Sequence, residues 1–568
     1  MSNGALIEIV SDTKNTGQQG FMLVKGSASA DILVCQEGLS FWGGVDPKNG
    51  QIIDRHHPNH TASIAGKIVL MPTSRGSCSG SGVLLELALN GHAPAALIFA
   101  SPEDILSLGA LVAERLFGKS IPIIHLDEAS YSALAKEPSA TIRTGAIISP
   151  ALHISLKAIS TDAMTLSDED QAFLDGTHGI AAQMAMEILC LMAISQHATA
   201  LISVTRGHID GCILAHDANL IFAEKMQEIG AKITIPTTIN AISVDRENWQ
   251  LQQVPPDFGT KASRLADAYV AMGARAVFTC APYLLSDKPQ LGEAIGWSES
   301  NAVIFANSIL GARTSKHPDY LDLFIAMTGR APASGVYHDK YRRAQIILEI
   351  TPPTNQPDSS FWPIIGWVCG RHAPHQIPLI TGLEALAPSQ DDLKNLCAAF
   401  GTTSGAPMLH IKGHTPEADL PVTTRAQIVP VTQAAIDDAY AALSPPLKHV
   451  DLIAIGSPHA SFDEVKYVHD ALGDRSCHEG VTVIITTSRD TVAALHEAGI
   501  YAPLKQAGVQ IISDICWCSI TAPIYPKTAR YVMTNSGKYA HYSYGLSGRK
   551  ACLASLQACV ETALSGTA

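Results

Sequence analysis

The stretch KIVLMPTSRGSCSGSG at residues 67–82 joins a short apolar run to a loop rich in glycine and serine. A helix is predicted directly after it over residues 83–89, and a second apolar strand over residues 95–100. The segment Ser101-Pro102-Glu103-Asp104 then has the composition of a helix start, and a third strand is predicted over residues 121–124. Strands that alternate with helices in this way build parallel sheets, so the pattern predicts an α/β fold.

This alternation lies inside a first unit predicted over residues 1–150, which opens with strands over 21–24 and 30–34. A linker is expected over residues 149–167, where periodicity lapses before Ser167 caps a new helix. Residues 151–568 form a second, larger region. Its last third repeats the alternation, with strands predicted over 450–455, 481–486 and 509–512 and a helix capped by Ser461 with Glu464 three positions on.

Length and charge exclude several classes of protein. The 568 residues are too many for one small binding module. A formal net charge of -13 leaves no general basic field to hold nucleic acid. With 46% hydrophobic and 16% charged residues, the chain has the composition of a large folded enzyme rather than a disordered scaffold.

The apolar segment over residues 180–194 is interrupted by Gln183 and Glu187 and is too short to cross a bilayer, so a buried helix is predicted there. The first ten residues, MSNGALIEIV, lack the pattern of a signal peptide. The twelve cysteines are scattered without a disulfide-framework spacing. A cytoplasmic protein with reduced cysteines and no membrane partner is therefore expected.

The loop over residues 73–82 is a candidate anion site. Its glycines let the backbone approach a ligand, the following helix presents free N–H groups, and Arg75 is able to pair with a carboxylate. The loop lacks the Gly-Lys-Ser/Thr ending of a phosphate-binding P-loop. An ordinary glycine-serine helix entry remains the alternative.

Three cysteines lie at or just beyond the ends of runs that are predicted to be strands: Cys280 ends the run 274–280, Cys369 ends the run 364–369, and Cys516 follows the run 509–512. Ligands of open parallel sheets bind beyond the carboxyl ends of the strands, so these thiols are candidates to converge on an iron–sulfur cluster. The alternative is that each is a small buried hydrophobe, because the chain has no CxxC pair.

Other groups of polar or reactive residues give weaker support for a particular kind of site. Cys369, His372 and His375 recur at short intervals, as in zinc sites, but no fourth ligand is indicated. No G-x-S-x-G elbow supports a serine hydrolase. The segment over residues 296–311 places Glu299 and Asn301 among apolar residues, which indicates hydrogen bonds either to a ligand or within an internal network, and Arg313 follows it as a further cation.

Taken together, these residues resemble the aconitase X family, the divergent branch of the aconitase superfamily. The resemblance covers nearly the whole chain. It is carried by SFWGGVDP (40–47), RGSCSGS (75–81), PTTIN (236–240), TCAPY (279–283), ESN (299–301), ANSILGART (306–314), GHTPEA (413–418) and TNSGK (534–538).

The resemblance implies an aconitase-like α/β fold in which an N-terminal swivel domain (1–150) is fused to a larger catalytic region (151–568) of two or three lobes with parallel sheets. It also implies an iron–sulfur cluster, expected to be [2Fe-2S]. Cys280 and Cys516 are its expected ligands from the matching motifs, and Cys369 is added from its predicted strand end, with Cys518 as the substitute. The chain departs from the archaeal pattern at Ser457, where archaeal members carry cysteine.

Two activities are implied. Single-chain bacterial members resemble cis-3-hydroxy-L-proline dehydratases, whereas archaeal members, which split off the swivel as a subunit, dehydrate mevalonate 5-phosphate. The fused chain favours the first, with Ser77 as the base that removes the C2 proton. Substrate-binding roles are expected for four residues: Arg75, Asn301, Arg313 and Lys538.

The expected product is Δ1-pyrroline-2-carboxylate, and the expected partner is a small hydroxy amino acid. The protein is expected to be a monomer or a small homo-oligomer. An iron-sensing RNA-binding protein is the alternative from another class, and the acidic charge of the chain counts against it.

Overall fold

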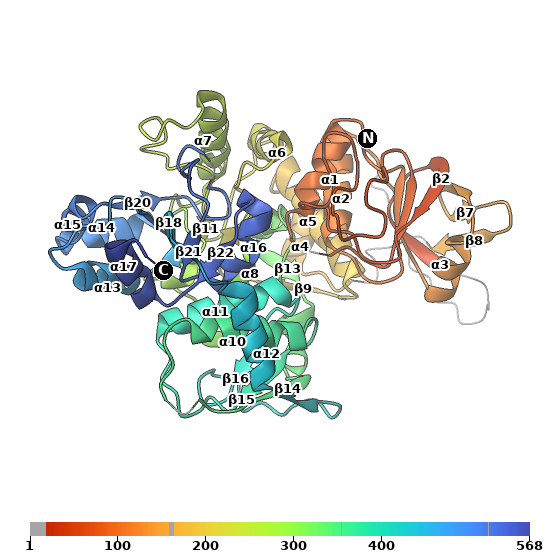
Figure 1. Cartoon of the computed structure of the whole chain (residues 1–568). Helices are drawn as coiled ribbons and strands as arrows, with labels where there is room; N and C mark the ends of the chain where they lie inside the picture. Colours follow the sequence, from red (N-terminus) through yellow and green to blue (C-terminus); the bar gives the residue numbers. More distant parts are fainter. Residues whose placement is uncertain are drawn as a thin grey trace.

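The computed structural model describes residues 19–75, 77–157, 159, 164–353, 355–520 and 522–567. The first ten residues, on which the expected lack of a signal peptide rests, lie outside the described residues, as does Gly76 of the glycine-serine loop. An N-terminal barrel packs at one side of three further lobes, which follow one another along the chain (Figure 1).

The N-terminal barrel is closed, with strand order β1-β5-β4-β3-β2-β6-β7-β8. Strands β2 to β5 pair in parallel, as the strand–helix alternation predicts, and β6, β7 and β8 continue from β2 by antiparallel pairing. Strand β1 closes the ring, parallel to β8 and antiparallel to β5. The elements are β1 (Gln19–Val24), β2 (Ala28–Val34), β3 (Ile68–Met71), α1 (Gly80–Leu89), β4 (Ala96–Phe99), α2 (Ile105–Phe117), β5 (Ile123–Leu126), α3 (Glu128–Leu134), β6 (Ser139–Arg143), β7 (Ala146–Ile148) and β8 (His153–Lys157).

Two local expectations for this part of the chain are wrong. Helix α2 begins at Ile105 rather than near Ser101, because the Glu103 carboxylate accepts the first free N–H groups, those of Leu106 (2.7 Å) and Ser107 (2.8 Å). The expected linker contains strand β8, which pairs with β1 and β7 and so closes the barrel beyond residue 150. Residues 158 and 160–163 of that linker lie outside the description.

The first lobe contains a parallel three-stranded sheet of order β11-β10-β12 and an antiparallel pair, β13-β9. The predicted buried helix is present as α5, and the capping box of Ser167 and Asp170 starts α4 as expected. The elements are α4 (Asp168–Leu174), α5 (Ile180–Ser195), β9 (Leu201–Ser203), β10 (Gly207–Ile209), α6 (Asp217–Glu228), β11 (Thr237–Ile239), α7 (Pro256–Ala271), β12 (Gly296–Trp297), α8 (Ser300–Phe305), a π-helical turn (Ala306–Leu310), α9 (Leu321–Thr328) and β13 (Arg330–Pro332).

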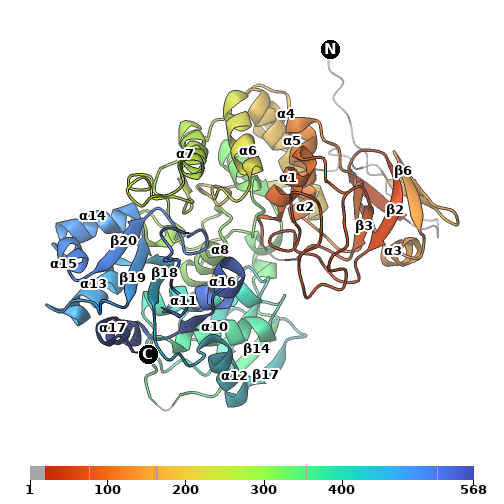
Figure 2. The same cartoon turned by 45° about the horizontal axis from the view of Figure 1, so that its top comes forward.

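The barrel and the first lobe share one apolar core. Buried side chains of α1 and α2, such as Val83 and Leu106, belong to the same cluster as Leu189 of α5 and Phe222 of α6. A Cβ on Gly82 of α1 would lie 3.1 Å from the Tyr320 hydroxyl, so the backbones approach closely there. Helices α1 and α2 therefore face α5 and α6 across the junction, as Figure 2 also shows.

The second lobe is a parallel sheet of order β16-β15-β14-β17 covered by helices α10 and α11. Its core is separate from that of the barrel. The elements are β14 (Ile346–Ile350), α10 (Phe361–His372), β15 (Pro378–Thr381), α11 (Gln390–Thr403), β16 (His410–Ile411), β17 (Gln427–Val431) and α12 (Gln433–Leu443).

The third lobe is an all-parallel sheet of order β20-β19-β18-β21-β22. Its predicted strands are present, and Ser461 and Glu464 form the predicted capping box of α13. The elements are β18 (Leu452–Ala460), α13 (Phe462–Leu472), β19 (Thr482–Thr487), α14 (Arg489–Glu497), α15 (Tyr501–Gln506), β20 (Val509–Ser513), β21 (Val532–Thr534), α16 (Gly537–Ser547), β22 (Ala551–Leu553) and α17 (Leu556–Ser565).

Helix α10 corrects one sequence prediction. The run over residues 364–369 is not a strand: Cys369 lies in the last turn of α10 and is fully buried in the core of the second lobe. A short apolar run does not distinguish a buried strand from a buried helix by periodicity, which explains the error.

Within the described residues, no helix is both long enough and apolar enough to cross a membrane.

The close packing of α10 on α11 generates a test of the fold. A Cβ on Gly366 would lie 2.2 Å from the backbone oxygen of Leu396, so we expect Gly366→Ala to lower the stability of the second lobe by about 1–3 kcal/mol. Gly545 in α16 has no heavy atom within 4 Å of the same position, and Gly545→Ala is expected to be neutral or stabilising by about 0.5–1 kcal/mol. Chemical denaturation followed by circular dichroism measures both, and equal effects would contradict the packing described.

Candidate active site

Three polar side chains follow the three parallel strands of the first lobe, at the edge where the strands end. Asp210 comes after β10, Asn240 after β11 and Glu299 after β12. The Asn240 side-chain amide donates to a carboxylate oxygen of Asp210 and to Glu299 Oε2, the latter at 3.1 Å. Carboxyl ends of parallel strands are where open α/β sheets bind their ligands, so these residues mark the site.

Glu299 also pairs with Lys538, which lies in the first turn of α16 in the third lobe, and the Lys538 Nζ–Glu299 Oε1 distance is 2.8 Å. Burial opposes ionisation of Glu299, but Lys538 and the hydrogen bonds from Asn301 lower its pKa to about 2. Asn301 in addition donates to the Cys280 backbone oxygen (3.1 Å) and accepts from the Tyr283 hydroxyl (2.8 Å). Asn301 and Lys538, both predicted site residues, are thus brought together around Glu299.

Three thiols gather next to this ion pair. Cys280, Cys516 and Cys518 pack together with Ala241, and the Cys516 thiol is within hydrogen-bond reach of both other thiols. All three sulfur atoms act on Lys538 and, with Glu299, raise its pKa against the effect of burial. Two of the three predicted cysteines and the predicted substitute therefore share one site, whereas Cys369 lies in another core.

The third lobe supplies a backbone contact to this group of thiols. The N–H of His459, in β18, donates to Cys280 Sγ at 3.2 Å. The His459 ring is fixed by Nε2 at 2.8 Å from the Ile515 carbonyl oxygen and by Nδ1 at 3.2 Å from Thr279 Oγ1. Burial lowers the pKa of His459 to about 4, so its imidazole is neutral near pH 7.

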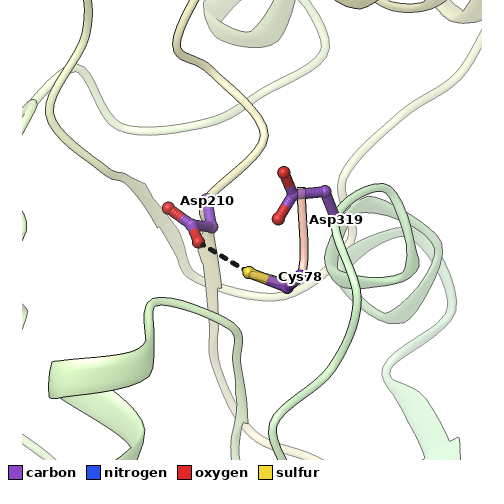
Figure 3. Close-up of side chains that lie close together, drawn as sticks. All are labelled: Cys78, Asp210 and Asp319. Atoms are coloured by element: carbon purple, nitrogen blue, oxygen red, sulfur yellow. Dashed lines mark hydrogen bonds between the residues drawn. The ribbon is translucent and has the colours of Figure 1, made fainter. Parts of the chain in front are cut away.

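The glycine-serine loop of the barrel meets the body of the protein at Cys78. The Cys78 thiol donates to Asp210 Oδ2 at 3.4 Å, and the Asp319 carboxylate points toward the same thiol (Figure 3). Within the described residues, these are the only three His, Cys, Asp or Glu side chains whose ligand atoms all lie within 4.8 Å of one another. The loop that sequence patterning singles out therefore reaches the strand-end residues of the first lobe.

The electrostatics of this contact are unusual, because several carboxylates are buried together. Burial raises the pKa of Asp210, and Glu299 and Asp319 raise it further. Burial also raises the pKa of Asp319, whose Oδ1 has no hydrogen-bond partner in the described structure. Burial also disfavours the charged form of the nearby Lys316 ammonium group and lowers its pKa to about 8.

Ser77, the predicted base, is half-buried in the barrel loop beside Cys78. Its hydroxyl donates to Ser79 Oγ at 3.4 Å, and its oxygen accepts the Ser79 backbone N–H at 3.3 Å. The Ser79 hydroxyl in turn interacts with Asp319. Ser77 is therefore linked through Ser79 to the buried carboxylates.

The two arginines predicted to bind substrate are engaged elsewhere. Arg75 pairs with Asp54 (3.1 Å) and Glu37 (3.4 Å) on the barrel, and its side chain is 41% exposed. The guanidinium of Arg313 pairs with Asp339 and donates to the Tyr337 carbonyl oxygen at 3.2 Å. The structure thus pairs both arginines with acids other than Glu299, the partner of Lys538.

Sequence reasoning does not single out Asp210, Asp319, Lys316 or Cys78 as functional residues. Asp210 follows a strand of only three residues, which is too short to be recognised from periodicity. Lys316 and Asp319 lie in an irregular segment before α9 that carries no motif of its own. The sequence signal that points to this group is the position of Cys78 inside the loop over residues 73–82, which is a candidate anion site.

Family models match the chain in four consecutive stretches. The aconitase X swivel domain matches residues 18–149, the aconitase X first domain 163–340, the second domain 344–441 and the third domain 450–565. The last three stretches correspond to the three lobes that follow the barrel.

Curated relatives agree with these matches. The chain is 45% identical to cis-3-hydroxy-L-proline dehydratase of Pseudomonas aeruginosa, with 96% of both chains covered. It is 42% identical to cis-3-hydroxy-L-proline dehydratase of Hypocrea jecorina, over 97% of this chain and 96% of the relative. Its identity to the phosphomevalonate dehydratase large subunit of Thermococcus kodakarensis is 31%, over 68% of this chain and 97% of that subunit.

A solved structure has the same architecture. The crystal structure of Thermococcus kodakaraensis aconitase X in its holo-form superposes with a TM-score of 0.63 at 30% sequence identity, covering 70% of this chain and all of that one. The four matched domains and the relatives of nearly equal length leave one assignment: the chain belongs to the aconitase X family.

Proposed function

We propose that the protein is a hydro-lyase that dehydrates cis-3-hydroxy-L-proline to Δ1-pyrroline-2-carboxylate with the help of an iron–sulfur cluster. The observation that carries this proposal is the match of 45% and 42% identity to two cis-3-hydroxy-L-proline dehydratases over almost the whole chain, the swivel domain included. A common site for the thiols and the swivel loop is supported by Tyr542, whose pKa is raised mainly by burial and also by Cys518 and by Cys78 of that loop.

The donor set fits an iron–sulfur cluster. Cys280, Cys516 and Cys518 supply three thiols, and the His459 N–H donates to one of the sulfur atoms, a contact that tunes such clusters. The three sulfurs are not all within 4.8 Å of one another, since the one triad of that spacing in the described part of the chain is Cys78 with two aspartates. This wider spacing favours a polynuclear cluster over a single ion, and we propose the [2Fe-2S] type.

In the proposed reaction Ser77 acts as the alkoxide: its Oγ takes the C2 proton, the C2–H electron pair forms the C2–C3 double bond, and the C3 hydroxyl leaves as water with a proton drawn from solvent. Ser77 Oγ–H then returns a proton to solvent, which restores the alkoxide. When bound, the cluster supplies a Lewis acid for that leaving hydroxyl. The Ser79 N–H stabilises negative charge on Ser77 Oγ. The enamine then tautomerises to the cyclic imine without further catalysis.

Substrate orientation is assigned to cations that face the site. Lys538 lies beside the thiols, and Lys316 acts on both Cys78 and Glu299 from the opposite segment. Each is placed to attract the substrate carboxylate, and this preorganised charge also stabilises the electron density that builds at C2 when the proton leaves. Arg75 pairs with Asp54 and Glu37, and Arg313 pairs with Asp339, so neither arginine is given this role.

Mevalonate 5-phosphate dehydration is the alternative. Its support is the likeness to the phosphomevalonate dehydratase large subunit of Thermococcus kodakarensis. That likeness covers only 68% of this chain, and the identity of 31% is lower than the identity to either cis-3-hydroxy-L-proline dehydratase. A phosphate dianion also requires surplus positive charge, whereas the described site combines several buried carboxylates with two lysines.

We further propose a cytoplasmic enzyme that acts as a monomer or small homo-oligomer. All twelve cysteines are free, which is compatible with a reducing compartment. The net charge of -13 disfavours a nucleic-acid partner.

The substrate assignment is tested by turnover. The anaerobically purified protein is expected to form the imine from cis-3-hydroxy-L-proline and to turn over mevalonate 5-phosphate at less than about one-hundredth of that kcat/KM, a gap typical of a site built for one polar substrate. Product analysis by mass spectrometry measures both. Faster turnover of mevalonate 5-phosphate would replace the proposal by its alternative.

The ligand set is tested by metal content. We expect Cys280→Ala, Cys516→Ala and Cys518→Ala to lose most of the iron, the acid-labile sulfide and the visible absorption of the wild type. Cys369→Ala is the matched control, because it also removes a buried thiol but from the core of the second lobe. Retention of colour in all three site variants, or loss in the control alone, would refute the set.

The base is tested by Ser77→Ala. We expect kcat/KM to fall by at least about 100-fold, the usual contribution of a positioned base, while iron and sulfide stay at the wild-type level. Ser74→Ala is the control in the same loop, since the Ser74 hydroxyl donates to Glu103 inside the barrel domain (2.6 Å). Activity of Ser77→Ala within a few-fold of Ser74→Ala would exclude the serine as base.

A further inference from the structure

Asp319 is the one carboxylate of the site that lacks a complete set of partners. Its side chain is 97% buried, and Oδ1 has no hydrogen-bond partner within the described residues. Figure 3 shows the carboxylate directed into the space next to Cys78 and Asp210. A buried, unpaired carboxylate oxygen is costly, which indicates that a donor outside the protein belongs there.

The neighbouring carboxylates are satisfied by the protein itself. Asp322 accepts the backbone N–H groups of Asp210 and Leu323, both at 2.7 Å. Glu299 pairs with Lys538, and Asp210 accepts from Asn240 and from the Cys78 thiol. The vacant acceptor capacity is thus concentrated at Asp319, with Asp210 beside it.

The charge of the site leads to the same conclusion. Four buried carboxylates, Asp210, Glu299, Asp319 and Asp322, face two described ammonium groups, those of Lys316 and Lys538. Burial and the neighbouring acids raise the pKa of Asp210, and a bound cation would favour its ionised form by offsetting the repulsion. A ligand that carries both a cation and an anion would complete this arrangement, with its cation at Asp319 and its anion at the lysines.

We propose that Asp319, with Asp210 beside it, binds the secondary ammonium group of the substrate and selects cyclic α-amino acids over hydroxy acids that lack this charge. This assignment rests on the proposed function, because it names the part of the substrate that the acidic side of that site recognises. The ammonium and the carboxylate of proline are both attached to C2. Holding one at Asp319 and the other at the lysines fixes the orientation of C2 in the site.

The experiment compares two ligands of equal ring size, L-proline and cyclopentanecarboxylate, by calorimetric titration of the cluster-loaded protein. The wild type is expected to bind L-proline about 10- to 100-fold more tightly, the range of a hydrogen bond to a charged group. Asp319→Asn is expected to bring this ratio close to one, mainly by weakening L-proline. Absence of L-proline binding, or an unchanged ratio in the variant, would overturn the proposal.

Controls separate a binding role from a folding role. Asp104→Asn removes another buried carboxylate with an unpartnered oxygen at the same domain junction, where Asp104 accepts from Gln196 (3.0 Å), and it should keep the wild-type ratio. Asp210→Asn is the second site variant and should also lower the ratio. Each variant must retain the cluster absorption; loss of the ratio in Asp104→Asn as well would count against a specific role for Asp319.

Two further readouts distinguish the outcomes. A divalent metal ion found in the wild type beyond the cluster iron, and absent from Asp319→Asn, would show that the acidic pair holds a metal and would overturn the ammonium assignment. Failure to turn over cis-3-hydroxy-L-proline would remove the proposed function, whereas a preference for L-proline over cyclopentanecarboxylate that depends on Asp319 would still support the recognition of a cyclic ammonium.

Discussion

The ion pair of Glu299 and Lys538 is the interaction on which the site depends. It joins the end of a strand in the first lobe to the first turn of a helix in the third, and it lies beside the thiols that come from both lobes. Removing one partner would leave a buried charge without compensation, which costs far more than the pair itself contributes. The pair therefore fixes the relative position of the two lobes at the point where chemistry is expected.

Around this pair, the lobes supply different kinds of group. The parallel strands of the first lobe end in carboxylates and an amide, the third lobe contributes two thiols and a lysine, and the barrel adds a loop of small polar residues. Asp210 and Asn240 directly follow strands and Lys538 lies in the first turn of a helix, whereas Asp319 and Cys518 lie in irregular segments. The site is thereby assembled from segments far apart in the sequence.

Much of this could be predicted from the sequence where local signals are strong. The Ser461 cap, the buried helix α5 and the alternation from β3 to β5 follow from residue types at fixed spacing. The third thiol could not be predicted firmly, because the run that ends at Cys369 is apolar on all sides and suits a helix as well as a strand. Pro363 does not exclude the helix, since it occupies the first turn, where its missing N–H is not needed.

Sequence reasoning also missed Asp210 and Asp319, the two acids that lie next to Cys78, for a physical reason. Asp210, Glu299 and Asp319 become neighbours only through tertiary packing, and each is preceded by a strand of two or three residues or by irregular chain. A local sequence pattern does not show which distant residues become neighbours when the chain folds. The substrate-binding roles of Arg75 and Arg313 stay predictions. The sequence did not show that nearby acids pair with both guanidinium groups.

The apolar core shared by the barrel and the first lobe has a consequence for how the enzyme is assembled. A relative named as a large subunit, that of phosphomevalonate dehydratase from Thermococcus kodakarensis, matches only 68% of this chain. Here a covalent tether holds the loop of Cys78 at a high effective concentration beside Asp210, so occupancy of the junction does not vary with dilution. One translation product thus carries both halves in fixed one-to-one stoichiometry, and neither half competes with the wrong partner for its apolar face.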